Sequence, residues 1–247
     1  MKNLPCFSRG VDLFRHKALV AEICSALQVR DNGTGMALDD FHSCGISGYT
    51  SKLQGDLATG AGAAPLPTYG FKGEAISSIS HFASLEIVTM FRQDPSTAFS
   101  KVISDGVTLS MARSTQRHEP GTTVTCTNLF HNRPVQRKAL LLLPASSQSE
   151  LSRIVQCLRS IDLINIGASI TVQAAQTGAV LLSTARFPTV LHAFSSLLPA
   201  RSASGLRTID ARGRSGGIRI SLILSSPFEP CRSRDLQLLF VNGRPCR

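Results

Sequence analysis

The first group in the chain whose residue types and spacing can do chemistry is an aspartate followed by two glycines. Residues 31–36 read Asp-Asn-Gly-Thr-Gly-Met and follow a stretch, residues 27–29, that alternates like the end of a strand. A carboxylate at a strand end can accept a hydrogen bond from the amino group of a flat base, and glycines let the ring approach the backbone. The same residues are also typical of an ordinary turn. Asp31, Gly33 and Gly35 are therefore candidates for holding a nucleobase.

A second group is suited to phosphate. Gly70 and Gly73 open a helix predicted over residues 73–83, and free N–H groups at a helix start form a cradle for an anion. The spacing is not that of a P-loop. Glu74, in the first turn, can equally have the plain structural role of an acid facing the helix dipole. Upstream, two hydroxyls and an ammonium group suit phosphate contact but indicate little alone: Thr50, Ser51 and Lys52.

A third group begins a predicted strand. Residues 121–124 read Gly-Thr-Thr-Val, and a threonine hydroxyl at a strand start, here Thr122, can help hold the edge of an adenine through water. The alternative is simply a strand with a β-branched run. Residues 128–134, Asn-Leu-Phe-His-Asn-Arg-Pro, follow it.

The elements that must position these groups are strands, helices and a loop in mixed order, which predicts an α+β layer structure. Helices are expected over residues 18–27, 73–83 and 150–161, and a Gly, Ala and Pro-rich loop over residues 53–68. Strands are expected over residues 85–88, 99–103, 122–127, 169–173, 180–183, 218–224 and 236–241, with a turn at Asn242-Gly243. A domain boundary is predicted near residues 144–149, Pro-Ala-Ser-Ser-Gln-Ser.

Composition indicates a globular protein. The 247 residues are 43% hydrophobic and 17% charged, and no apolar run approaches the ~20 residues that span a bilayer. The N-terminus has no signal-peptide pattern, so we expect a soluble intracellular protein without a membrane partner. Seven scattered cysteines, with no C-x-x-C pair and no zinc-ligand spacing, indicate reduced thiols and no metal site.

Positive charge gathers late in the chain. The net charge is +10, and residues 201–247 hold nine arginines against three acidic residues. A basic surface attracts the phosphate backbone of nucleic acids without reading their sequence, although basic surfaces also occur in proteins that bind none. The candidate DNA contacts are Arg212, Arg214, Arg219, Arg232 and Arg234.

The order and spacing of these motifs resemble the ATPase region of MutL homologues, which act in DNA mismatch repair. The resemblance rests on D-N-G-x-G-M, then T-S-K, then Y-G-F-K-G-E-A, then G-T-T-V with L-F-x-N-x-P-V-x-R-K. The closing L-F-V-N-G-R-P also looks like a segment of that family's second domain. The match covers residues 27–143 firmly and 150–247 loosely. Gyrase, Hsp90 and sensor histidine kinases share the ATP-binding fold but lack the fourth motif.

The resemblance implies a fold and a domain order. We expect an α/β (α+β) two-layer sandwich, with a GHKL-type (Bergerat) ATP-binding domain over residues 1–145 and a ribosomal-protein-S5-like β-α-β domain over residues 146–247. The second domain would contact DNA. The family pattern also suggests that the first domain is N-terminally incomplete and the second C-terminally truncated.

The resemblance also implies roles for single residues. Asp31 would accept the adenine amino group, with Gly33 and Gly35 beside the base and Thr122 at the adenine end of the pocket. The residues that match the family's other nucleotide-contacting segments are Thr50, Ser51, Lys52, Gly70, Phe71, Lys72, Gly73, Glu74, Ala75 and Ile76.

The sequence departs from the family at the catalytic motif. In MutL homologues E-L-x-x-N-S-x-D-A precedes the D-N-G motif, its Glu acting as general base and its Asn holding Mg²⁺. None of the thirty residues before Asp31 spells it, and Glu22 has the wrong spacing and partner to replace that Glu. Lys72 replaces an arginine, keeping the charge but losing its planar fork. No catalytic residue is therefore assigned.

The expected function is mismatch repair in the nucleus. ATP and Mg²⁺ would be cofactors, with dimerisation and DNA engagement coupled to nucleotide binding, and another MutL homologue would be the partner in a heterodimer. Whether the chain hydrolyses ATP stays open. The alternative is a non-catalytic DNA-binding or heterodimerising partner without ATPase activity, which the departure at the catalytic motif favours.

Overall fold

The described part of the chain forms two compact units. The computed structural model describes residues 15–20, 26–50, 70, 72–142, 144–175, 177–198, 203, 205–213, 218–228 and 236–246. The first unit comprises Met1–Val155 and Ser169–Thr184, and the second comprises Gln156–Ala168 and Ala185–Arg247.

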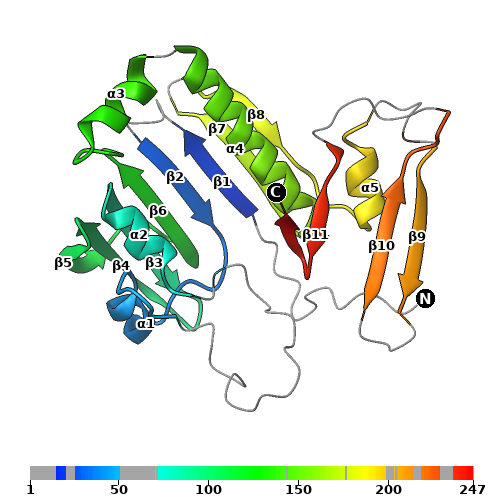
Figure 1. The fold of residues 1–247 in the computed structure, drawn as a ribbon. Coiled ribbons are helices and arrows are strands. Elements are labelled where there is room, and N and C mark those ends of the chain that lie inside the picture. Colours follow the sequence, from blue (N-terminus) through cyan, green and yellow to red (C-terminus); the bar gives the residue numbers. More distant parts are fainter. Residues whose placement is uncertain are drawn as a thin grey trace. The chain divides into compact units, whose positions relative to one another are not determined.

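The first unit is built on an eight-stranded sheet (Figure 1). Its strands are β1 (Arg15–Val20), β2 (Ala26–Asp31), β3 (Ser84–Phe91), β4 (Asp94–Ser104), β5 (Val107–Ser114), β6 (Gly121–Thr127), β7 (Ser169–Ala174) and β8 (Val180–Ser183). Their order is β5-β4-β3-β6-β2-β1-β7-β8. β1 and β7 are parallel, and every other neighbouring pair is antiparallel.

Two short helices and one face of this sheet enclose the core. The buried members of this apolar cluster are Phe41 of α1 (Leu38–Ser43), Leu85 and Ile87 of β3, and Ile103 of β4. Ile76 of α2 (Ala75–Ser80) packs against them. Figure 1 shows α1 and α2 on the same side of the sheet. Because side chains alternate between faces along a strand, residues 85 and 87 point toward these helices together.

The remaining elements are helices and hairpins. Helix α3 (Pro134–Leu142) is followed by α4 (Pro144–Ile164), and the division between the two units falls within α4. The second unit contains α5 (Val190–Ser195), the hairpin of β9 (Arg207–Arg212) and β10 (Arg219–Leu224), and the hairpin of β11 (Leu239–Val241) and β12 (Arg244–Cys246). Asn242 and Gly243, at φ of 51° and 75°, form the predicted turn between the last two strands.

Most predicted elements are confirmed, as is the mixed α and β class. The helix expected over residues 18–27 is wrong, because residues 15–20 and 26–31 are strands and residues 21–25 lie outside the described ranges. Short apolar runs suit helix or strand, and pairing of β1 with both β2 and β7 decides for the strand. The loop predicted over residues 53–68 lies outside the described residues.

The observed division differs from the boundary expected at residue 145. Residues 144–149 belong to α4, and residues 169–184 return to the first unit because β7 pairs along its whole length with β1. The assignment of the second unit to an S5-like domain stays a prediction.

Candidate functional site

A row of polar residues lies where the apolar face of the sheet ends. On β3 and β6, Leu85 lies opposite Cys126, Ile87 opposite Val124, and Thr89 opposite Thr122. The ladder of β2 and β6 ends at Arg30 opposite Thr123, so Asp31 and Thr122 are the next residues in line. Two apolar rows are thus followed by a third made of Thr89, Thr122 and Asp31.

Asp31 is held from two directions by backbone N–H groups. Its Oδ1 accepts a hydrogen bond from Gly33 N at 2.8 Å and from Thr122 N at 3.1 Å. Within the described part of the chain, no hydrogen bond from a protein donor reaches its Oδ2. The carboxylate is therefore fixed by one oxygen, and the second is available to a ligand donor.

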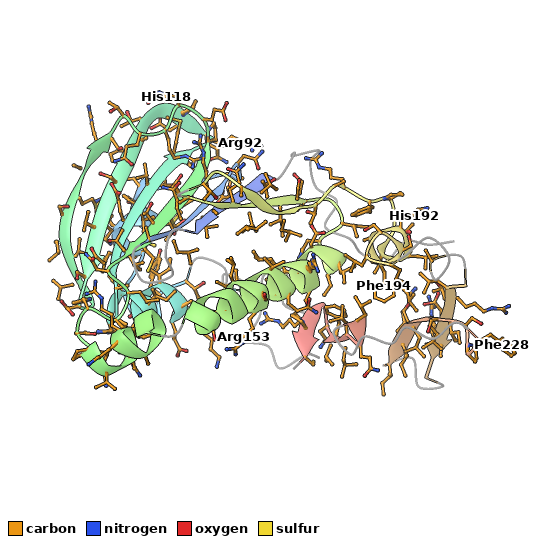
Figure 2. The ribbon with its side chains drawn as sticks, turned by 90° about the horizontal axis from the view of Figure 1, so that it is seen from above. Arg92, His118, Arg153, His192, Phe194 and Phe228 are labelled. Carbon is orange, nitrogen blue, oxygen red and sulfur yellow. The ribbon has the colours of Figure 1, made fainter. Side chains whose placement is uncertain are left out.

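Thr89 holds the loop that follows Asp31 in place by hydrogen bonds. Its buried hydroxyl accepts a hydrogen bond from Met36 N at 3.0 Å and donates one to Gly121 O at 3.3 Å, with Thr122 Oγ1 3.4 Å away. Arg92, labelled in Figure 2 at the end of the sheet, donates from Nη2 to the carbonyls of Asn32 at 3.3 Å and Gly33 at 3.4 Å. The loop after Asp31 is thus held by side chains of β3 and of the turn that follows it.

Two of the predicted glycines are required by close backbone approach. Gly35 has φ of +70°, and a Cβ there would lie 2.0 Å from Met90 O. Gly73 has φ of +69°, and a Cβ would lie 2.1 Å from Tyr49 O. Gly73 therefore brings the segment predicted to hold phosphate against Tyr49, the residue before Thr50. Two motifs far apart in sequence meet here.

Tyr49 and Lys101 hold α1 beside these segments. Tyr49 Oη donates a hydrogen bond to Asp40 Oδ1 at 2.9 Å, which is the main cause of the raised pKa of Tyr49. Lys101 Nζ on β4 is buried and donates to the carbonyls of His42 and Cys44, each at 2.7 Å, and of Phe41 at 3.3 Å. Burial lowers the pKa of Lys101. The lysine therefore caps the C-terminal carbonyls of α1.

A buried arginine lies behind the row. Arg117 donates to Asp31 O at 2.8 Å, Pro120 O at 3.1 Å, Glu119 O at 3.3 Å and Thr123 Oγ1 at 2.6 Å. Burial is the main cause that lowers the pKa of Arg117; Arg30 adds to it, while Asp31 and Glu119 act in the opposite direction.

The other predicted residues lie in α2, lie in the segments around it, or fall outside the described residues. Glu74 is the N-cap of α2, but its side chain makes no capping hydrogen bond, and the side chain of Ile76 packs on the core. Ala75 begins α2, and Thr50, Gly70 and Lys72 are described and have interactions of their own. Six candidates lie outside the described residues: Ser51, Lys52, Phe71, Arg214, Arg232 and Arg234. Glu22, to which no role was assigned, lies outside them too.

The two described DNA-contact candidates lie together. Arg212 on β9 is directly opposite Arg219 on β10, and both are exposed. Arg219 Nη2 lies 3.9 Å from Asp210 Oδ1.

Sequence reasoning missed Thr89, Arg92, Lys101 and Arg117. Thr89 interrupts the apolar run of residues 87–91 in β3, which is the only signal that could have found it. The others carry no recognisable motif. Arg92 and Lys101 donate to carbonyls 57 to 60 residues away in sequence, and Arg117 donates to Asp31 O, 86 residues away, as well as to nearer groups.

Two negative findings concern the described ranges alone. They contain no group of three or more His, Cys, Asp or Glu side chains arranged to hold a metal ion. They also contain no helix with the length and apolar content needed to cross a membrane.

Comparisons with known proteins agree on one family. The DNA mismatch repair protein MutL of Opitutus terrae is 29% identical over 221 residues, which cover 90% of this chain and 33% of that protein. Human DNA mismatch repair protein Mlh3 is 28% identical over 221 residues, covering 88% of this chain and 14% of that protein. No protein-family model matches the chain.

A solved structure has the same fold. The ATPase domain of Aquifex aeolicus MutL, complexed with ADP, superposes with a TM-score of 0.64 at 18% identity, covering 96% of this chain and 77% of that one. The predicted GHKL-type ATPase fold is thereby confirmed. The DNA mismatch repair protein MutL of Halobacterium salinarum is 30% identical over 217 residues, covering 87% of this chain and 31% of that protein. The chain spans a third or less of the length of these curated relatives, and it belongs to the MutL family of DNA mismatch repair proteins.

Proposed function

We propose that the first unit binds ATP, with the adenine held at Asp31, and that nucleotide binding serves DNA mismatch repair. The observation that carries the proposal is the geometry of Asp31. One carboxylate oxygen is anchored by two backbone N–H groups, and the other is left for a donor such as the 6-amino group of adenine. Gly33 has no side chain to obstruct a flat ring beside it. The missing side chain of Gly35, in contrast, makes room for the carbonyl of Met90.

The phosphates would lie toward the segments that Gly73 brings together. Thr50 and Lys72, with Ser51 and Lys52 as sequence candidates, supply hydroxyl and ammonium donors. Helix α2 has six residues, so its dipole contributes less than the backbone N–H groups and side chains of the segments around it. The ADP complex of the Aquifex aeolicus MutL domain supports a nucleotide at this fold.

Magnesium, the second expected cofactor, has no residue assigned to it. No cluster of acidic, histidine or cysteine side chains there is arranged to hold a cation. We therefore assign no residue to Mg²⁺ and no step to it. We do not propose that the chain hydrolyses ATP, because no described residue is assigned as the general base that this reaction needs.

The test is binding of a labelled ATP analogue to the whole chain, which has no tryptophan to report binding itself. Asp31→Asn keeps the size of the side chain but turns an amide NH₂ or a neutral oxygen toward the adenine amino group. We expect affinity to fall by roughly 10- to 100-fold, the effect of losing a hydrogen bond to a charged group. Asp39→Asn, at an exposed position of α1, is the matched control and should bind the ATP analogue as wild type does.

A folded chain that does not bind the analogue would contradict the proposal. It would favour the alternative of a DNA-binding or heterodimerising mismatch-repair partner without ATPase activity. Equal binding by wild type and Asp31→Asn would contradict the assignment of Asp31 alone.

DNA and a second MutL homologue are the proposed partners. Arg212 and Arg219 form an exposed positive pair on the second unit, which supports contact with a phosphate backbone. Heterodimerisation and a nuclear location follow from the resemblance to the eukaryotic relatives. Co-purification with a tagged MutL homologue and imaging of the tagged chain test these two points.

A further inference from the structure

Arg117 is a buried cation that the proposed nucleotide contacts leave unexplained. Its exposed fraction is 3%, and its four hydrogen bonds go to three carbonyls and one hydroxyl. No carboxylate in the described ranges accepts a hydrogen bond from it. Removing a charge from water costs free energy, so the arrangement of these four hydrogen bonds calls for an explanation.

The hydrogen bonds of Arg117 lie where the backbone ladder of β2 and β6 stops. The last paired residues are Arg30 and Thr123. Beyond them the carbonyl of Asp31 accepts from Arg117 Nη2, and its carboxylate accepts from Thr122 N. The main chain and the side chain of Asp31 are thus fixed by two different donors, and Arg117 provides the first.

Arg117 acts from the reverse face of the sheet. Thr122 and Thr123 are neighbours on β6, so their side chains point to opposite faces. Thr122 lies in the row with Asp31 and Thr89, whereas the hydroxyl of Thr123 accepts from Arg117 Nη1 at 2.6 Å. The guanidinium therefore does not face a base at Asp31, and any effect on that base passes through Asp31.

Gly121 gives independent evidence that the fold requires the contact between Arg117 and Asp31. Its φ is +129°, and a Cβ at this position would lie 2.4 Å from Arg117 Nη2 and 2.4 Å from Asp31 O. Any side chain at residue 121 would therefore separate the two groups that the hydrogen bond joins.

We infer that Arg117 is a positioning residue that sets the base preference of the nucleotide site, by holding the main chain of Asp31 so that its free carboxylate oxygen meets an amino group. The inference rests on the proposed ATP-binding function. A carboxylate held there accepts from the 6-amino group of adenine and repels the 6-oxo group of hypoxanthine. Base preference is thus the property that the position of Asp31 controls.

The experiment measures the affinities of the whole chain for ATP and for ITP, by competition against the labelled ATP analogue. Arg117→Met removes the donors, and Arg117→Lys keeps the charge but not the planar fork. We expect the preference for ATP over ITP to fall about tenfold in both variants. Arg113→Met, an exposed arginine on β5, is the matched control and should keep the wild-type preference.

The ratio of the two affinities separates positioning from general stability. A structural role alone would lower the melting temperature and weaken both nucleotides equally, which would overturn the inference. In an Asp31→Asn background, Arg117→Met should change the ratio little, because both changes act through one carboxylate. Independent, additive effects on the ratio would also overturn it.

If both Arg117 variants fail to fold, a variant with a smaller structural change tests the inference. Thr123→Val keeps the shape of the side chain and deletes one acceptor of the guanidinium. We expect it to lower the preference for ATP over ITP by a few-fold, and an unchanged preference would overturn the inference. Failure of the underlying proposal looks different: wild type would then bind no nucleotide, or Asp31→Asn would bind ATP normally.

Discussion

Gly35 and Gly48 share a left-handed backbone but differ in their surroundings. A Cβ at Gly35, where φ is +70°, would lie 2.0 Å from Met90 O, whereas at Gly48, where φ is +79°, nothing lies within 4 Å. Gly48→Ala should therefore cost only the left-handed strain, about 1–2 kcal/mol. Gly35→Ala should cost about 3–5 kcal/mol, because a backbone carbonyl must also move. Urea unfolding followed by circular dichroism measures both, and equal costs would contradict this account.

The thiol of Cys126 gives stability a pH dependence. Burial raises its pKa above the 9.0 of an ordinary thiol. Above pH 9.0 the unfolded chain releases this proton while the folded protein still holds it. The contribution of Cys126 to stability is therefore complete below that pH and is lost as the pH rises through the folded pKa.

Cys126→Ala isolates this effect. The difference in unfolding free energy between wild type and the variant should stay constant from about pH 7 to about pH 8, and shift against wild type from about pH 9 upward. Urea unfolding in the presence of a reductant measures it. A difference that stayed constant at alkaline pH, or that moved in favour of wild type, would contradict the assignment of the raised pKa.

The candidate site could be predicted in part at the scale of single residues. Asp31 and Thr122 were assigned to one pocket because their motifs resemble those of the MutL family, and the structure joins them by a hydrogen bond across 91 residues. The spacing of the motifs in the sequence does not predict this hydrogen bond, because the bond depends on the register of β2 against β6. Arg117 could not be predicted, since three of its four acceptors are backbone carbonyls, which carry no sequence signal.

At the scale of elements, α1 depends on a side chain from another element. Its six residues are too few for a stable isolated helix, and its C-terminal carbonyls accept hydrogen bonds from Lys101 Nζ on β4. Lys101→Met would leave buried carbonyls without a donor, at a cost of about 2–3 kcal/mol. We expect faster hydrogen exchange at the amides of α1 than in wild type, with little change in β7 and β8.

Lys138→Met, at an exposed position of α3, is the matched control for this prediction and should leave exchange in α1 unchanged. An equal increase throughout the sheet would mean that Lys101 supports the whole first unit. It would then not act as the cap of α1.

The elements themselves were predictable where their pattern was long or mostly apolar. Residues 85–88 and the amphipathic stretch 150–161 were expected correctly as parts of β3 and α4. The helix expected at residues 18–27 is wrong because a short, mostly apolar stretch suits a helix or a strand equally. The pairing of β1 with β2 and β7 decides for the strand. The domain boundary expected at residues 144–149 stays a prediction. In the structure this serine-rich stretch begins α4, and β7 returns to the first sheet.

At the scale of the whole molecule, the excess of positive charge has one measurable consequence. The net charge is +10, and the hairpin of β9 and β10 carries exposed Arg207, Arg212 and Arg219. Arginines that contact phosphates release bound counterions, so affinity for duplex DNA should fall linearly with the logarithm of salt concentration. The affinity should depend little on base sequence, because phosphate contacts carry no sequence information.

Replacing both Arg207 and Arg212 by Gln tests whether this hairpin makes the contacts. Each phosphate contact adds about 0.9 to the salt slope, so the double variant should lower the slope by about 2 and weaken binding to all duplexes alike. Fluorescence anisotropy of labelled duplexes over a series of salt concentrations measures the slope. Arg153→Gln is the matched control, because Arg153 is already paired with Glu150 at 2.6 Å. An unchanged slope in the double variant would place the contacts elsewhere, and a slope near zero in wild type would contradict binding through the phosphate backbone.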